Sequence, residues 1–153
     1  PSGPHDAPCL VASHGHTIDH RPDRGTTYQI GNPAWLHALT GLPVTSVDEA
    51  RIAAAALLAK GVGAVIITLG EKGALYQDAT RTVHVPPFYA GPVVETTGAG
   101  DAFNGGFAAA LAEGQDPVEA VRFGSATAGI SVTRAGTAPA MPARAEIEAL
   151  LRS

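Results

Sequence analysis

The sequence predicts an α/β fold, in which a mainly parallel sheet carries helices on both faces. An Ala-rich stretch over residues 50–60 is followed at once by the apolar run VGAVIITLG, residues 62–70. A short run of this kind is typical of a strand buried on both faces, as in sheets that helices cover on each side. A helix followed directly by such a strand indicates an α/β sheet. The 153 residues are enough for one domain with a buried core.

The start of the chain has a different composition, and residues 1–30 are expected to be irregular or disordered. Residues 1–43 hold five of the six histidines and six of the twelve prolines, and no apolar period appears before about Tyr28. A wrong reading frame upstream, or a truncated gene, would leave the same bias. The sequence does not separate these origins from a genuine variable segment.

The elements that surround the buried strand follow local signals. SVDE, residues 46–49, is a capping box that starts the Ala-rich helix, and Gly61 ends it. After the strand, EKG at 71–73 turns the chain into ALYQD and TRTVHVPPF, residues 74–78 and 80–88, which are expected to pair as strands.

Three further helices are expected in the last third of the chain. Residues 102–112 are helical by composition, with Phe103 and Phe107 on one face. DPVE, residues 116–119, combines an N-cap Asp with a Pro at the first helical position, which predicts a helix from there to about residue 133. Residues 144–151 form an amphipathic pattern that closes the chain.

A glycine-rich stretch, VVETTGAGDAFNGGF at residues 93–107, places a single carboxylate, Asp101, behind a tight turn. If the turn leads directly into a helix, free backbone N–H groups and the positive helix end face one small volume that suits an anion. A carboxylate is unfavourable there unless it acts on a group beside the anion. A base that takes a proton from a hydroxyl attacking a phosphoryl group is such a role. Glycines alone, without the acid, are more often just a tight turn before a helix.

ETTGAGDAFNGGF, residues 95–107, resembles the second signature of the ribokinase, or phosphofructokinase-B (PfkB), family of carbohydrate kinases, whose usual form is Asp-Thr-Thr-Gly-Ala-Gly-Asp-x-Phe. Residues 65–76 resemble the family's nucleotide-site strand and turn, residues 116–142 its adenine-site helix and following loop, and residues 31–41 its Pro-Asn-x-x-Glu helix start. The resemblance covers about residues 31–153 and implies the C-terminal part of a ribokinase-like kinase domain. The half with the sugar-binding glycines and the lid is then expected to be missing.

The resemblance implies ATP and Mg²⁺ as cofactors and a role for each matching residue. Asp101 would be the catalytic base. The anion hole would consist of the backbone amides of Gly98, Ala99, Gly100 and Asp101. The nucleotide would be bordered by Asn32, Thr68, Leu69, Gly70, Gly73 and Ser125.

Two positions depart from the family pattern. Glu95 stands where the family usually has an Asp that helps to hold a monovalent cation such as K⁺, and its extra methylene would displace or abolish that ion. Trp35 stands where the family places a glutamate that organises Mg²⁺ through water, which an indole cannot do.

The expected function is ATP-dependent phosphorylation of a hydroxyl of a sugar or related small alcohol. One alternative is a truncated fragment that binds nucleotide without turnover, and another is a half that a partner chain completes. A homo-oligomer is a separate partner state that the sequence leaves open. A third is a metal-dependent hydrolase built on HGHTIDH, residues 14–20. In that segment one extra residue moves Asp19 and His20 out of register with the His-x-His-x-Asp-His motif of metallo-β-lactamase-like hydrolases, and zinc catalysis needs fixed ligand geometry.

Other classes of protein are disfavoured by composition and motif. The net charge of −4 gives no reason to expect nucleic acid, and no apolar run is long enough for a membrane span. The start lacks the pattern of a signal peptide, so a cytoplasmic protein is expected. Cys9 is the single cysteine, so the sequence offers neither a disulfide framework nor a thiolate metal cage. No Gly-Lys-Ser/Thr occurs, and Phe103 stands where a dinucleotide fingerprint would need glycine.

Overall fold

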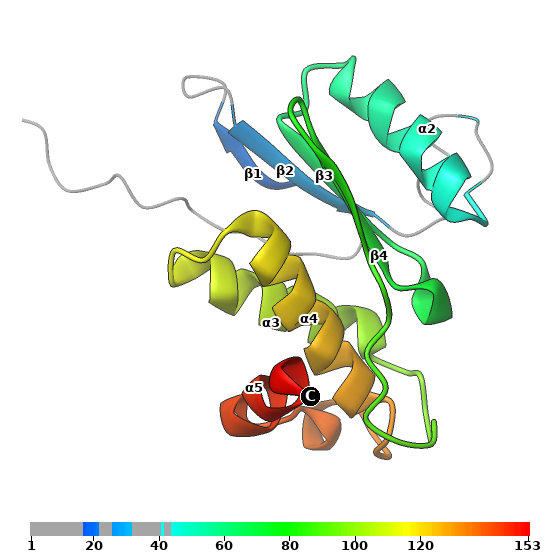
Figure 1. The fold of residues 1–153 in the computed structure, drawn as a ribbon, viewed down its shortest axis with the longest axis vertical. Coiled ribbons are helices and arrows are strands. Elements are labelled where there is room, and N and C mark those ends of the chain that lie inside the picture. The colour runs from blue at the N-terminus through cyan, green and yellow to red at the C-terminus, as the bar shows by residue number, and fades with distance from the viewer. Residues whose placement is uncertain (1–16, 22–25, 32–40, 42–43) are drawn as a thin grey trace, which may run out of the picture.

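The computed structural model describes residues 17–21, 26–31, 41 and 44–153. Five strands form one sheet, in the order β1 (Thr17–Arg21), β2 (Thr26–Gly31), β3 (Ala64–Thr68), β4 (Ala74–Asp78) and β5 (Thr82–Val85). The helices are α2 (Val47–Leu58), α3 (Ala99–Ala112), α4 (Pro117–Ser131) and α5 (Arg144–Arg152), with short 3₁₀ turns η1 (Gly70–Lys72) and η2 (Ala138–Ala140). Helix α2 covers one face of the sheet and α3 and α4 cover the other, as Figure 1 shows. None of the helices described has the length and apolar character that a membrane span requires.

The α/β class and the helices on both faces agree with the sequence analysis, but the strand directions do not. Among the described strands, only β2 and β3 are parallel, whereas β1–β2, β3–β4 and β4–β5 are antiparallel. Short turns connect β3, β4 and β5, and such turns can join only antiparallel neighbours. A parallel pair needs a long crossover, and the segment that contains α2 provides it between β2 and β3. The expectation of a mainly parallel sheet is therefore wrong for this part of the fold.

The structure also differs from the expectation that residues 1–30 are irregular, because β1 and most of β2 lie within them. Tyr28–Gly31 of β2 pair with Ala64–Ile67 of the buried strand β3. Pairing with a buried neighbour stabilises a strand whose own sequence signal is weak, since strand formation depends mainly on context.

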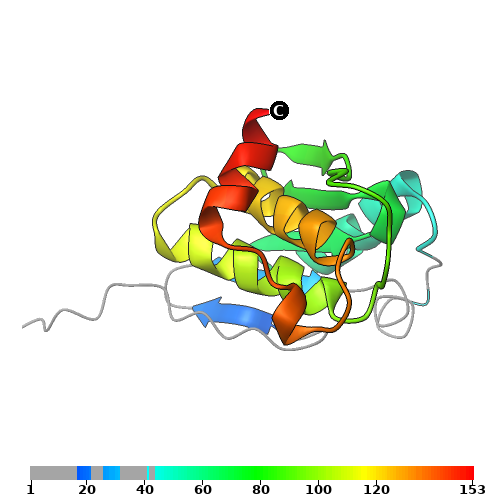
Figure 2. The ribbon, with the colours of Figure 1, turned by 90° about the horizontal axis from the view of Figure 1, so that it is seen from below.

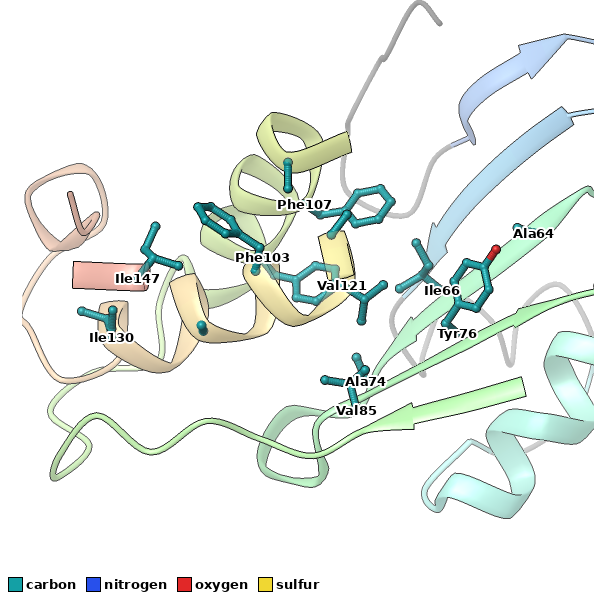
Figure 3. Close-up of a cluster of buried hydrophobic side chains, with 14 residues drawn as sticks. Ala64, Ile66, Ala74, Tyr76, Val85, Phe103, Phe107, Val121, Ile130 and Ile147 are labelled. Carbon is teal, nitrogen blue, oxygen red and sulfur yellow. The ribbon is translucent and has the colours of Figure 1, made fainter. Parts of the chain in front are cut away.

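The sheet separates two hydrophobic cores, because successive residues of a strand point to opposite faces. Val65 and Ile67 of β3 pack in the cluster that contains α2. Ile66, between them, packs in the cluster of α3 and α4 with Phe107 and Val121 (Figure 3). This arrangement confirms that β3 is buried on both faces, as its continuous apolar run predicts. Helix α5 lies against α4 on the outside of this second layer (Figure 2).

Helices α3 and α4 approach closely at Gly124. A Cβ atom on Gly124 would lie 2.8 Å from the Phe103 carbonyl oxygen and 3.2 Å from Phe107. We expect Gly124→Ala to lower the free energy of unfolding by about 1–3 kcal/mol, because the overpacked helices must move apart. Urea denaturation measures this change.

Gly105→Ala is the matched control on the same helix pair, since a Cβ on Gly105 would meet no heavy atom within 4 Å. We expect this variant to gain roughly 0.5–1 kcal/mol from helix propensity. Gly124→Ala and Gly105→Ala proteins of equal stability would show that the two helices do not depend on this close contact.

Candidate functional site

The glycine-rich turn leads directly into α3, as the sequence predicts. Gly98 is the N-cap residue, with a left-handed φ of 80° and no side-chain hydrogen bond to cap the helix. N–H groups in the first turn of a helix lack intrahelical acceptors and carry the positive end of the helix dipole. One predicted donor differs: the N–H of Ala99 donates to the Thr96 carbonyl at 3.2 Å. The Ala99 N–H is therefore engaged within the turn itself.

A pocket of about 620 Å³ lies beside this turn. That volume falls within the usual range for small-molecule sites. Residues predicted from three separate segments line it together: Thr68, Gly70, Gly73, Ala99, Gly100 and Ser125. These segments are the end of β3 with its following turn, the start of α3, and the middle of α4.

The other predicted residues lie elsewhere. Leu69 is buried and holds the turn after β3 through its backbone, because its N–H donates to the Gly73 carbonyl at 2.8 Å. Gly98 and Glu95 do not line the pocket. Asn32, like Trp35, lies outside the described residues.

The turn after β3 needs glycine at its last position. Gly73 has a φ of 85°, and a Cβ there would lie 2.1 Å from the Val85 carbonyl oxygen. The Nε2 atom of His84 lies 2.7 Å from the Lys72 carbonyl oxygen and holds the turn against β5. This edge of the pocket is thus fixed by contacts to the backbone carbonyl groups of Val85 and Lys72.

The segment of residues 86–95 is here called the strap, and part of it forms the far wall of the pocket together with part of α4. Most of the lining residues that the sequence analysis missed come from this wall: Pro87, Phe88, Tyr89, Ala90, Gly91, Val93, Ala128, Gly129 and Val132. The others are Glu71, Thr96 and Phe103. A Cβ on Gly129 would lie 2.4 Å from the Phe88 carbonyl oxygen. Gly129 follows the predicted Ser125 by four residues, so helical spacing could have placed both on one face.

Glu95 connects the glycine-rich turn to the loop after α4. Its carboxylate accepts a hydrogen bond from the Gly136 backbone N–H at 2.8 Å. This bond, together with one from the Thr97 hydroxyl, lowers the pKa of Glu95 below its ordinary value. Close by, a Cβ on Gly98 would lie 3.0 Å from the Thr137 methyl group, so the two loops are in direct contact.

Asp101 is an exposed residue in the first turn of α3. It directly follows the lining residue Gly100 but does not itself line the pocket. A carboxylate in this position interacts favourably with the helix dipole. The glycine-rich turn and the candidate base therefore lie next to each other at the pocket edge.

No candidate metal centre of three or more His, Cys, Asp or Glu side chains occurs in the part of the chain that the structure describes. The HGHTIDH segment lies largely outside it. Residues 14–16 are not described, and residues 17–20 belong to β1, whose side chains are also outside the described set.

Comparison with known proteins identifies the family. The model of the pfkB family carbohydrate kinases matches residues 8–144. The chain therefore belongs to this family, as the resemblance of its motifs implies. The match begins upstream of residue 31, where the sequence analysis placed the start of the resemblance.

Individual relatives are sugar kinases and share the fold. A deoxyribokinase of Salmonella typhi is 42% identical over 113 residues, which are 74% of this chain and 37% of that protein. The structure of Arabidopsis thaliana ribokinase complexed with ribose and ATP is 34% identical, with a TM-score of 0.77 over 82% of this chain and 41% of that one. Phosphofructokinase-2 of Escherichia coli in complex with potassium is 28% identical, with a TM-score of 0.70 over 80% and 40%. The chain thus spans about two fifths of the length of these relatives.

Proposed function

We propose that this chain forms the nucleotide-binding part of an ATP-dependent kinase that phosphorylates a hydroxyl of a sugar or related small alcohol. One observation supports this proposal above the others. The glycine-rich turn and the predicted nucleotide residues of two other segments line a single pocket, and Asp101 lies directly beside it. Membership of the pfkB family adds independent support. A cytoplasmic location, where ATP is supplied, belongs to the same proposal.

In this mechanism the phosphates of ATP bind at the start of α3. The amides of Gly100 and Asp101 stabilise the charge on the transferred phosphoryl group, and the absence of a side chain at Gly100 lets the phosphate approach the backbone. The Asp101 carboxylate accepts the proton of the attacking hydroxyl, whose oxygen bonds to the terminal phosphorus as the bond from that phosphorus to ADP breaks. The base of the nucleotide then extends toward Ser125 and the strap.

Mg²⁺ fits this site as a companion of the phosphates. The ion binds in such sites through substrate phosphates, waters and one or two carboxylates. When bound, Mg²⁺ neutralises the charge on the transferred phosphate.

A monovalent cation such as K⁺ fits the described residues less well. The carboxylate of Glu95 already accepts hydrogen bonds from Gly136 and Thr97. These bonds occupy lone pairs that would otherwise coordinate a cation. We infer that Glu95 holds the two loops together directly.

The proposed function is tested by phosphoryl transfer in two contexts: the chain alone, and the chain joined to the N-terminal part of a ribokinase relative. Labelled ATP is supplied with ribose, deoxyribose and other small alcohols. We expect a labelled sugar phosphate from the joined protein and not from the chain alone, because the chain spans only about two fifths of the length of its relatives.

ATP binding without transfer by the chain alone would favour the nucleotide-binding fragment, or the half that another chain completes. A chain that binds no ATP, and a joined protein that forms no phosphorylated product with any alcohol, would contradict the proposal.

A further inference from the structure

Tyr89 is the large apolar side chain with the greatest exposure among the described residues, at 77%. It nevertheless lines the candidate nucleotide pocket. Large aromatic rings in such exposed positions lack a packing partner and often mark a binding surface. Tyr89 therefore exposes most of its surface at the pocket edge.

The strap holds Tyr89 in place from both sides. Before it, the Arg122 guanidinium lies 5.4 Å from the centre of the Phe88 ring, and the Phe88 carbonyl packs against Gly129. After it, the N–H groups of Val94 and Glu95 donate to the Val132 carbonyl at 2.8 and 3.2 Å. The backbone of the strap is therefore tied to α4 on each side of Tyr89, which reduces the entropy that a ligand must overcome in ordering it.

The end of the pocket at the strap is chemically different from the end at α3. Phe88, Ala128, Gly129 and Val132 provide mostly apolar surface there, and Ser125 adds a hydroxyl. The opposite end presents the glycine-rich turn and the start of a helix. A ligand with a flat apolar group at one end and negative charge at the other complements this arrangement.

We propose that Tyr89 stacks on the nucleobase and covers it against water, an inference that rests on the proposed nucleotide-binding function. Stacking on an aromatic ring depends on the π face that every base possesses. The contribution of Tyr89 is therefore nearly the same for adenine and guanine, and it is absent for a ligand without a base. Tyr89 strengthens nucleotide binding without selecting between the two purines.

The test compares wild-type protein with Tyr89→Ala and Tyr89→Phe by calorimetry, with ATP, GTP and inorganic tripolyphosphate as ligands. We expect Tyr89→Ala to weaken ATP and GTP binding by the same factor, about 5- to 150-fold, the range for loss of one base–aromatic stack. Tripolyphosphate should bind all variants equally. Tyr89→Phe should retain wild-type affinity, because the ring remains.

Ile52→Ala is the control variant. It removes another exposed apolar side chain, on the opposite face of the sheet, and should bind all three ligands as the wild type does.

Two results would overturn the inference while leaving the proposed function intact. Tyr89→Ala could bind ATP as tightly as the wild type, or it could lose tripolyphosphate binding to the same degree as ATP, which would assign the ring a structural role. A wild-type protein that binds neither ATP nor tripolyphosphate would instead refute the proposed function, and the role of Tyr89 with it.

Discussion

Asp101→Asn lowers the rate of phosphoryl transfer by about 10²–10⁴-fold, the usual range for the loss of a positioned base. The amide keeps the size and shape of the carboxylate but cannot accept the proton of the attacking hydroxyl. Affinity for ATP should hold or rise, because a negative charge beside the phosphates is removed. The measurement is the turnover rate, together with ATP affinity, of the chain joined to the N-terminal part of a ribokinase relative.

Asp48→Asn is the matched control for this substitution. Asp48 is also an exposed acid in the first turn of a helix, but α2 lies on the opposite face of the sheet. We expect its turnover to equal that of the unmodified protein. Unchanged turnover in Asp101→Asn, or a loss of ATP binding in a correctly folded variant, would show that Asp101 is a helix-stabilising acid or a ligand rather than a base.

Local sequence signals predicted the helices of this chain well. The capping box of α2 is present, since the Ser46 side chain accepts from the Glu49 N–H and Glu49 caps the start of the helix in return. Asp116 likewise caps α4 by accepting from the Val118 N–H, with Pro117 as the first helical residue. These features depend on residues three or fewer positions apart, so one short stretch of sequence contains all the information.

Sheet pairing and the far wall of the pocket could not be predicted in the same way. The strand β2 forms because it meets β3, and the two are separated by more than thirty residues. The strap lines the pocket because Phe88 packs on Gly129 and Val94 bonds to Val132. Such contacts join segments that are distant in the sequence, and the strand or helix propensities of single residues do not predict them. The position of Tyr89 in the pocket therefore could not be predicted from the local sequence.

The second large effect is expected at Gly100. A Cβ at this position would meet no heavy atom within 4 Å, so the fold has room for a side chain on this residue of the pocket lining. Valine there should block the close approach of phosphate to the backbone amides. Because a hydrogen bond to a charged group contributes about 1.5–3 kcal/mol, we expect Gly100→Val to weaken ATP and tripolyphosphate binding by roughly 10- to 150-fold. Calorimetry measures both affinities.

Gly105→Val separates this effect from the lower helix propensity of valine. Gly105 lies on the same helix, also has open space around its Cβ position, and does not line the nucleotide pocket. Its valine variant should bind both ligands as the wild type does. Equal losses of affinity in the two variants would indicate that α3 is disturbed as a whole.

The most direct test of phosphate binding at the start of α3 is to follow the backbone amide resonances of the isotope-labelled chain by NMR during titration with tripolyphosphate. We expect the amide resonances of Gly100 and Asp101 to shift most and these shifts to vanish in Gly100→Val. Saturable binding that leaves both amide resonances unchanged in the wild-type chain, with the largest shifts in another part of the molecule, would contradict phosphate binding at the start of α3.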